Sequence, residues 1–129
     1  MRIAFWVMGL MSLANGLWML FEPAAWYEKL PAGVPDTGPL NVHFVRDIGA
    51  AFTTIGVALC ASAPRAEERR GVILAVSLFY VLHALIHVAD LISGRLEAEH
   101  WLVDLPGVFL PALILLVLSH PRWWPPRKL

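Results

Sequence analysis

The most prominent pattern in the sequence is a series of long apolar runs that contain no charged residue. One run extends from Ile3 to Phe21, and another, from Val72 to Ala89, is uncharged apart from its two histidines. A helix rises 1.5 Å per residue, so about 20 residues cross the hydrocarbon core of a bilayer. Both runs have about this length, and each therefore predicts a membrane-spanning helix.

Two shorter apolar runs, Ile48 to Ala63 and Leu105 to Ser119, reach the same length when the polar turn before each is included. The first run is expected to stay in the mature chain, because its 19 residues exceed the roughly 7 to 15 apolar residues of a signal peptide. The sequence thus predicts an all-α, integral membrane four-helix bundle in one domain. Its helices are expected at about 3–21, 41–63, 72–93 and 102–119, with a basic, aromatic tail at 120–129.

The composition agrees with a membrane protein and excludes several other classes. Hydrophobic residues make up 58% of the 129 residues and charged residues 16%, against about 45 to 50% and about 25% in soluble domains. Ten basic and ten acidic residues give no net charge, so nucleic-acid binding is not expected. The single cysteine, Cys60, excludes an internal disulfide and a CxxC site.

The basic residues predict the orientation of the bundle. Most of them lie at the termini and in the loop between the second and third helices: Arg2, Arg65, Arg69, Arg70, Arg122, Arg127 and Lys128. The other two loops contain only Lys29 and Arg95. Since Lys and Arg mark the cytoplasmic side, we expect both termini in the cytoplasm of a multi-pass protein of a bacterial inner membrane.

Ionisable residues inside the predicted spans concentrate on two helices. His43 and Asp47 are four residues apart on the second helix and share a face. On the third helix, His83, His87 and Asp90 lie within about 40° of one line. Because the two helices are joined by a short turn, they should be antiparallel neighbours. His43 would then lie level with Asp90, and Asp47 level with His87.

Such a cluster of imidazoles and carboxylates is typical of a site for iron, zinc, manganese or copper. The predicted ligands are His43, Asp47, His83, His87 and Asp90. Residues expected around them are Arg46, which would orient a carboxylate, a lid of His100 and Asp104, and Glu22 and Asn15 from the first helix. If the protein is an enzyme, the metal would assist oxidation or hydrolysis of a lipophilic small molecule that enters between the helices.

Three alternatives remain open from the sequence. Haem could be ligated by two histidines from facing helices, drawn from His43, His83 and His87. The cluster could be a purely structural network in an accessory or scaffold subunit of a respiratory or photosynthetic membrane complex, with a membrane-protein partner or a second copy beside it. A proton or ion relay is the third, although the apolar inner half of the bundle disfavours a continuous path.

The helix order carries a resemblance to a known group. Four short spanning helices, the run Arg46-Asp47-Ile48-Gly49 followed by Gly56, and a compact basic loop together resemble the small bacterial DoxX-like membrane proteins. The resemblance implies a four-helix membrane fold. Characterised members are linked to quinone-coupled sulfur oxidation or membrane redox complexes, but the HxxxHxxD run from His83 to Asp90 is not attributable to them, so their activity is not transferred.

Overall fold

The structure, a computed structural model, describes residues 1–124. Every regular element in this part of the chain is helical, which confirms the predicted all-α class. The elements are α1 (Arg2–Phe21), α2 (Pro23–Lys29), η1 (Val34–Thr37), α3 (Val42–Ser62), α4 (Ala66–Ile92), α5 (His100–Val103), the π-helical turn η2 (Leu105–Phe109), α6 (Leu110–Ser119) and η3 (Pro121–Trp123). Residues 125–129 of the predicted tail lie outside the described residues.

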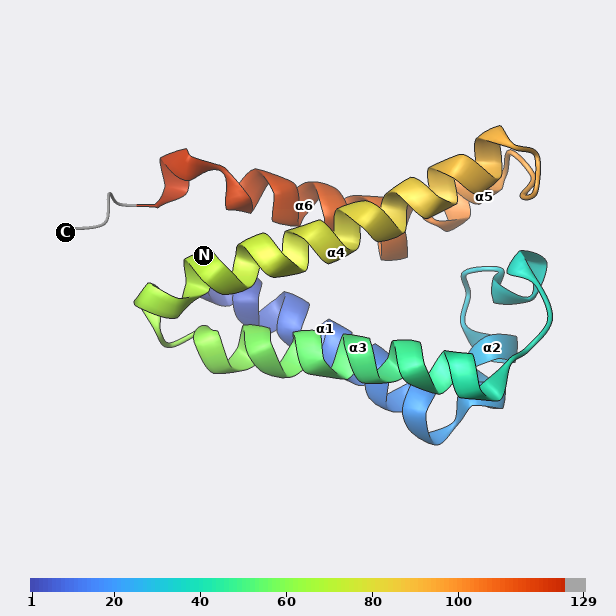
Figure 1. The fold of residues 1–129 in the computed structure, drawn as a ribbon, viewed down its shortest axis with the longest axis horizontal. Helices are drawn as coiled ribbons and strands as arrows, with labels where there is room; N and C mark the ends of the chain where they lie inside the picture. Colours follow the sequence, from blue (N-terminus) through green and yellow to red (C-terminus); the bar gives the residue numbers. More distant parts are fainter. Residues whose placement is uncertain (125–129) are drawn as a thin grey trace.

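The long helices form two pairs that lie one above the other (Figure 1). One pair is α1 with α3 and the other is α4 with α6. The start of α1, the turn between α3 and α4, and the end of α6 lie at one end of the molecule, and α2, η1 and α5 lie at the opposite end (Figure 1). We call these the terminal end and the loop end.

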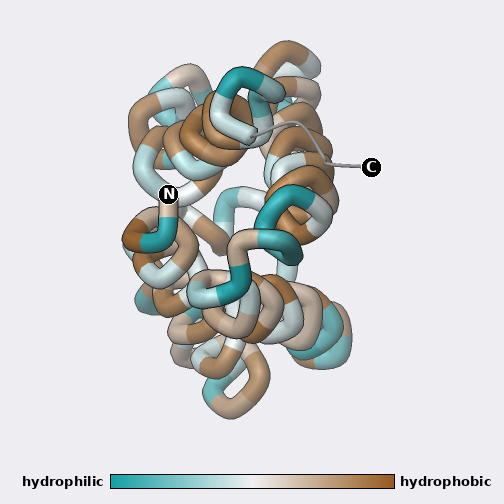
Figure 2. Tube along the Cα trace, turned by 90° about the vertical axis from the view of Figure 1, so that its left-hand side faces the viewer, coloured by the Kyte–Doolittle hydropathy of each residue, from teal (hydrophilic) through white to brown (hydrophobic). Residues whose placement is uncertain are grey.

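Three helices are long and apolar enough to cross a membrane, namely α1, α3 and α4. The remaining apolar segment, Leu105–Ser119, is shorter and would extend about 22 Å as a regular helix, against about 30 Å of hydrocarbon. Hydrophobic positions run along the helices (Figure 2), and many large apolar side chains are exposed, among them Ile3, Leu78 and Leu116. The chain therefore fits a membrane protein that contacts a lipid bilayer.

The helix α4 begins at Ala66, before the predicted position 72, and includes a charged first turn. Glu67 and Glu68 lie in that turn, where carboxylates interact favourably with the positive end of the helix dipole. The Arg69 guanidinium donates hydrogen bonds to the Ala63 carbonyl at the end of α3. These local interactions extend the helix beyond the apolar run on which the prediction rested.

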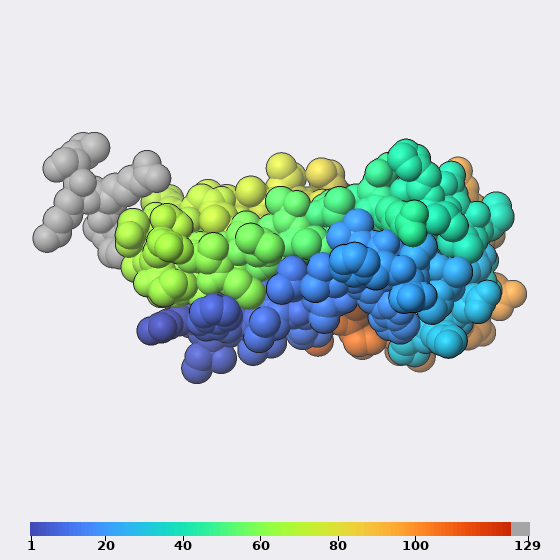
Figure 3. Space-filling model, turned by 90° about the horizontal axis from the view of Figure 1, so that it is seen from below, coloured from blue at the N-terminus to red at the C-terminus, as the bar shows by residue number. Residues whose placement is uncertain are grey.

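Glycines bring α1 and α3 into backbone contact. A Cβ at Gly16 would lie 2.5 Å from the backbone nitrogen of Thr53, and one at Gly56 would lie 2.6 Å from the backbone nitrogen of Leu13. The surfaces of the two helices adjoin in the space-filling view (Figure 3). Without large side chains between them, helices in lipid gain van der Waals contact, so this pair forms the most closely packed part of the fold.

Hydroxyl groups of α4 join this helix to both α1 and α6. Tyr80 and Ser12 share a buried hydrogen bond with an oxygen–oxygen distance of 2.9 Å, which links α4 to α1. The Ser77 hydroxyl donates to the Leu115 carbonyl of α6 at 3.0 Å. The interior of the bundle is thus partly polar in the turns of α4 that precede His83.

Two prolines shape the entry into α6. Pro106 and Pro111 lack a backbone N–H, and a proline ring clashes with the carbonyl four residues earlier. The chain widens here into the π-helical turn η2, in which the Phe109 N–H donates to the Asp104 carbonyl. The turn fixes Asp104 at the junction between α5 and η2.

Candidate functional site

A buried histidine–aspartate pair lies between α4 and the start of η2. The His87 Nδ1 and the Asp104 Oδ2 are 2.8 Å apart, and the Asp104 side chain is only 2% exposed. The Asp104 backbone is held on both sides, because its N–H donates to the His100 carbonyl and its carbonyl accepts from Val108. The carboxylate therefore fixes Nδ1 of the His87 ring, and Nε2 has no hydrogen-bond partner within residues 1–124.

A second imidazole stands beside this pair. The ring centroids of His83 and His87 are 4.8 Å apart. Phe79 stacks on the His83 ring with an interplanar angle of 10°, and Phe52 of α3 meets it edge-on. Among residues 1–124, neither His83 nor the Nε2 of His87 makes a hydrogen bond to protein.

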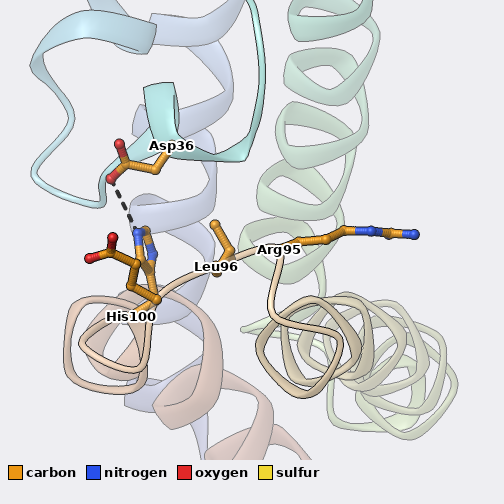
Figure 4. Close-up of a pocket in the computed structure, with 5 residues that line it drawn as sticks. Asp36, Arg95, Leu96 and His100 are labelled. Carbon is orange, nitrogen blue, oxygen red and sulfur yellow. Dashed lines mark hydrogen bonds and ion pairs between the residues drawn. The ribbon is translucent and has the colours of Figure 1, made fainter.

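A similar pair lies at the loop end of the molecule. The His100 Nε2 of α5 is 3.2 Å from the Asp36 Oδ2 of η1, and His100 is buried at 6% exposure. The two residues line a pocket of about 290 Å³ together with Arg95, Leu96 and Glu97 (Figure 4). Within the described part of the chain, the buried His100 Nδ1 has no hydrogen-bond partner.

Two of the predicted ligands, His43 and Asp47, contact each other instead of the cluster. They share a face of α3, as predicted, with 3.4 Å between Nε2 and Oδ2, but their side chains are 89% and 61% exposed. The buried stripe of α3 includes Val45, which is two residues, or about 200°, away from each of them around the helix. The face that carries His43 and Asp47 therefore points away from His87.

Asp90 forms an ion pair with a residue that follows it closely in the chain. Its Oδ1 accepts a hydrogen bond of 2.9 Å from Arg95, just beyond the end of α4. In residues 1–124, no group of three or more His, Cys, Asp or Glu side chains lies close enough to hold a metal ion. The structure thus divides the predicted ligands into separate pairs, with His83 and His87 together on α4 and His43 and Asp47 together on α3.

The residues predicted to surround the ligands are also distributed over the fold. Arg46 donates to the Leu20 carbonyl at the end of α1, and Asn15 accepts from the Trp26 indole of α2. Glu22 is exposed at the junction of α1 and α2. Only Asp104 of this set contacts a predicted ligand directly, while His100 lies one turn before it on α5.

Sequence reasoning missed Asp36 and the aromatic neighbours of His83. Asp36 lies in a proline-rich loop, 64 residues before its partner His100, and nothing in the local sequence distinguishes it from a solvated loop carboxylate. Phe52 and Phe79 follow the apolar pattern of their helices. The one available signal was the spacing of Phe79 and His83, which are four residues apart and share a helix face.

Comparisons with known proteins place the chain in a family without assigning an activity. Searches of curated proteins and of solved structures found no match. No comparison assigns the chain to the DoxX-like group, so that resemblance stays a prediction. A family model described as a domain of unknown function, DUF4345, matches residues 1–118, and the chain therefore belongs to the DUF4345 family.

Proposed function

We propose that the protein crosses a bacterial inner membrane four times, with the terminal end in the cytoplasm. Leu105–Ser119 would be the fourth crossing, lengthened at the loop end by α5. The support is that the described termini and the turn between α3 and α4 lie at one end (Figure 1), and that this end carries Arg2, Arg65, Arg69 and Arg70.

Cysteine labelling tests this orientation. In a Cys60→Ala background, cysteines introduced at Thr37 and at Glu67 should differ in their reaction with a membrane-impermeant maleimide added to intact cells. Thr37→Cys should react and Glu67→Cys should react only after the cells are opened, because the two positions lie at opposite ends of the molecule. The reverse pattern would contradict the proposal and would put the loop end in the cytoplasm.

We further propose that His83 and His87 bind one transition metal ion, with Asp104 orienting His87. The observation that carries this proposal is the pair of unpartnered imidazole nitrogens on one face of α4. Two histidines four residues apart are a common metal-binding arrangement on helices. A carboxylate on the other nitrogen of a metal-binding histidine is equally common and raises the basicity of the ligand.

Two imidazole ligands limit which metal ions the site would bind and which reactions it would support. Imidazole suits zinc, copper, iron and nickel. With two protein ligands, the other positions of the ion would be filled by water or by a bound molecule, so the site would be open and suited to oxidation or hydrolysis of a lipophilic substrate. Haem receives less support, because ligation from facing helices would need His43, which is exposed on α3.

Equilibrium binding to the purified, chelator-treated protein tests the site. With Co²⁺ or Zn²⁺ as the probe, we expect one ion per chain, and binding at least tenfold weaker in His83→Ala and in His87→Ala. Asp104→Asn should weaken binding about 10- to 100-fold, the usual effect of removing a partner of a ligand. His43→Ala is the matched control and should bind as the wild type does.

The binding measurements distinguish a metal site from a haem site and from no site. Absence of a stoichiometric ion in the wild type, or an equal loss in His43→Ala, would overturn the metal proposal. An intense Soret band in the protein as isolated would indicate haem instead.

The second candidate is an accessory subunit in which the polar groups only hold the bundle together. It is favoured by the observation that polar contacts join different elements: His87 to Asp104, His100 to Asp36, and Ser12 to Tyr80. This candidate predicts a metal-free protein that co-purifies with a membrane partner or a second copy from mild detergent.

A further inference from the structure

The short helix α5 and the residue that follows it supply the buried member of two histidine–aspartate pairs. His100 begins the helix and contacts Asp36 of η1, while Asp104 follows its last residue and contacts His87 of α4. The two side chains are four residues apart, so they lie on the same face. The opposite face is apolar and exposed at Trp101 and Leu102.

Packing alone does little to hold α5 in place. It has four residues, and the element it contacts most is η2, which follows it in the chain. An isolated helix of this length is not stable in water. The two polar pairs, one at each end, therefore add to the packing of η2 against α4 in holding α5 in place.

The His100 ring meets the loop along one edge. Asp36 accepts the hydrogen bond from Nε2, and Gly33 lies beside the same edge, since a Cβ at Gly33 would be 2.8 Å from the neighbouring Cε1 and 2.9 Å from the Asp36 Oδ2. Gly33 also has a left-handed φ of 59°, which favours glycine. The loop that holds Gly33 and Asp36 thus contacts the His100 side chain of α5 closely.

We propose that Asp36 and His100 are positioning residues for the interior cluster. Their contact holds α5 in place, and α5 in turn holds Asp104 against the Nδ1 of His87. When the contact is removed, Asp104 loses its fixed position, and the His87 ring is no longer held with Nε2 free. What the cluster binds rests on the proposed function, but the positioning is measurable without any metal.

Nitrogen NMR of protein labelled with ¹⁵N-histidine tests the positioning. In the metal-free wild type, His87 should show one tautomer with a hydrogen-bonded Nδ1 proton. Asp36→Ala should shift the His87 signals toward a mixture of tautomers, whereas His100→Gln, which keeps an N–H donor for Asp36, should retain the wild-type signals. Asp36 is 65% exposed in its side chain, so its removal leaves the core intact, and circular dichroism checks the fold.

A matched control uses the exposed histidine–aspartate pair on α3. Asp47→Ala removes the partner of His43 on α3 and should leave the His87 signals unchanged. Unchanged His87 signals in folded Asp36→Ala would overturn the proposal, as would an equal shift in Asp47→Ala.

Two glycines provide an independent test. Gly33 and Gly94 both have left-handed backbone, with φ of 59° and 72°, but a Cβ at Gly94 would meet nothing within 4 Å. Gly33→Ala and Gly94→Ala therefore introduce similar backbone strain, and only the first pushes on His100 and Asp36. The His87 signals should change in Gly33→Ala alone; a change in both variants or in neither contradicts the positioning.

The measurements distinguish failure of the metal proposal from failure of the positioning proposal. If the wild type binds no metal but Asp36→Ala still shifts the His87 signals, the metal proposal fails and the positioning stands. If metal binds and Asp36→Ala alters neither the His87 signals nor the affinity, the positioning fails and the metal proposal stands. If both stand, the affinity in Asp36→Ala should fall about tenfold or more, as expected for the loss of a partner of a ligand.

Discussion

Alanine in place of Gly16 or Gly56 should push α1 away from α3 and destabilise the protein by about 1–3 kcal/mol or more. The new methyl group would meet backbone atoms, which cannot move aside as a flexible side chain can: the Thr53 nitrogen at 2.5 Å from Gly16, and the Leu13 nitrogen at 2.6 Å from Gly56. The two helices would have to separate along their contact and lose dispersion energy over its length. Reversible unfolding in mixed micelles measures the change in free energy.

Gly71→Ala is the control for these variants. Gly71 is also in a helix, α4, but a Cβ there would meet nothing within 4 Å. Alanine has a higher helix propensity than glycine, by about 1 kcal/mol, so Gly71→Ala should be neutral or stabilising. A loss of stability in Gly71→Ala as large as in Gly16→Ala would show that helix contact is not the cause.

The same glycines explain why the sequence located the helices better than the site. The pattern of apolar runs predicted the three long helices, and the spacing of His43 and Asp47 predicted their shared face. Spacing cannot say which face of a helix points inward. On α3 the inner face is taken by the stripe of Gly49 and Gly56 that contacts α1, and this contact turns the polar face outward.

Helix periodicity did not predict the contact between Asp104 and His87, for a different reason. Asp104 reaches His87 because the chain forms the π-helical turn η2 after α5, and a prediction based on a regular helix from 102 to 119 contains no such turn. Asp90 lay on the expected face of α4, but Arg95 follows within one and a half turns and pairs with it. Local partners of this kind compete with the long-range contacts that a helix face suggests.

The largest effect at the site should come from His87→Ala, and it should exceed the effect of Asp104→Ala. Removing the imidazole leaves a carboxylate that is 2% exposed without its partner, and an uncompensated buried charge costs about 3–5 kcal/mol. Removing the carboxylate instead leaves a neutral ring with one unpaired N–H, at about 1–3 kcal/mol. Unfolding in mixed micelles compares the two variants.

The double variant gives the decisive comparison, because a buried pair is not a sum of independent contributions. With both side chains replaced by alanine, no unpaired charge remains, so the double variant should be more stable than His87→Ala alone. The exposed pair on α3 is the control: His43→Ala and Asp47→Ala should each change the free energy of unfolding by less than about 1 kcal/mol, with additive effects. Additive losses in His87→Ala and Asp104→Ala would contradict a coupled, charged pair in the folded protein.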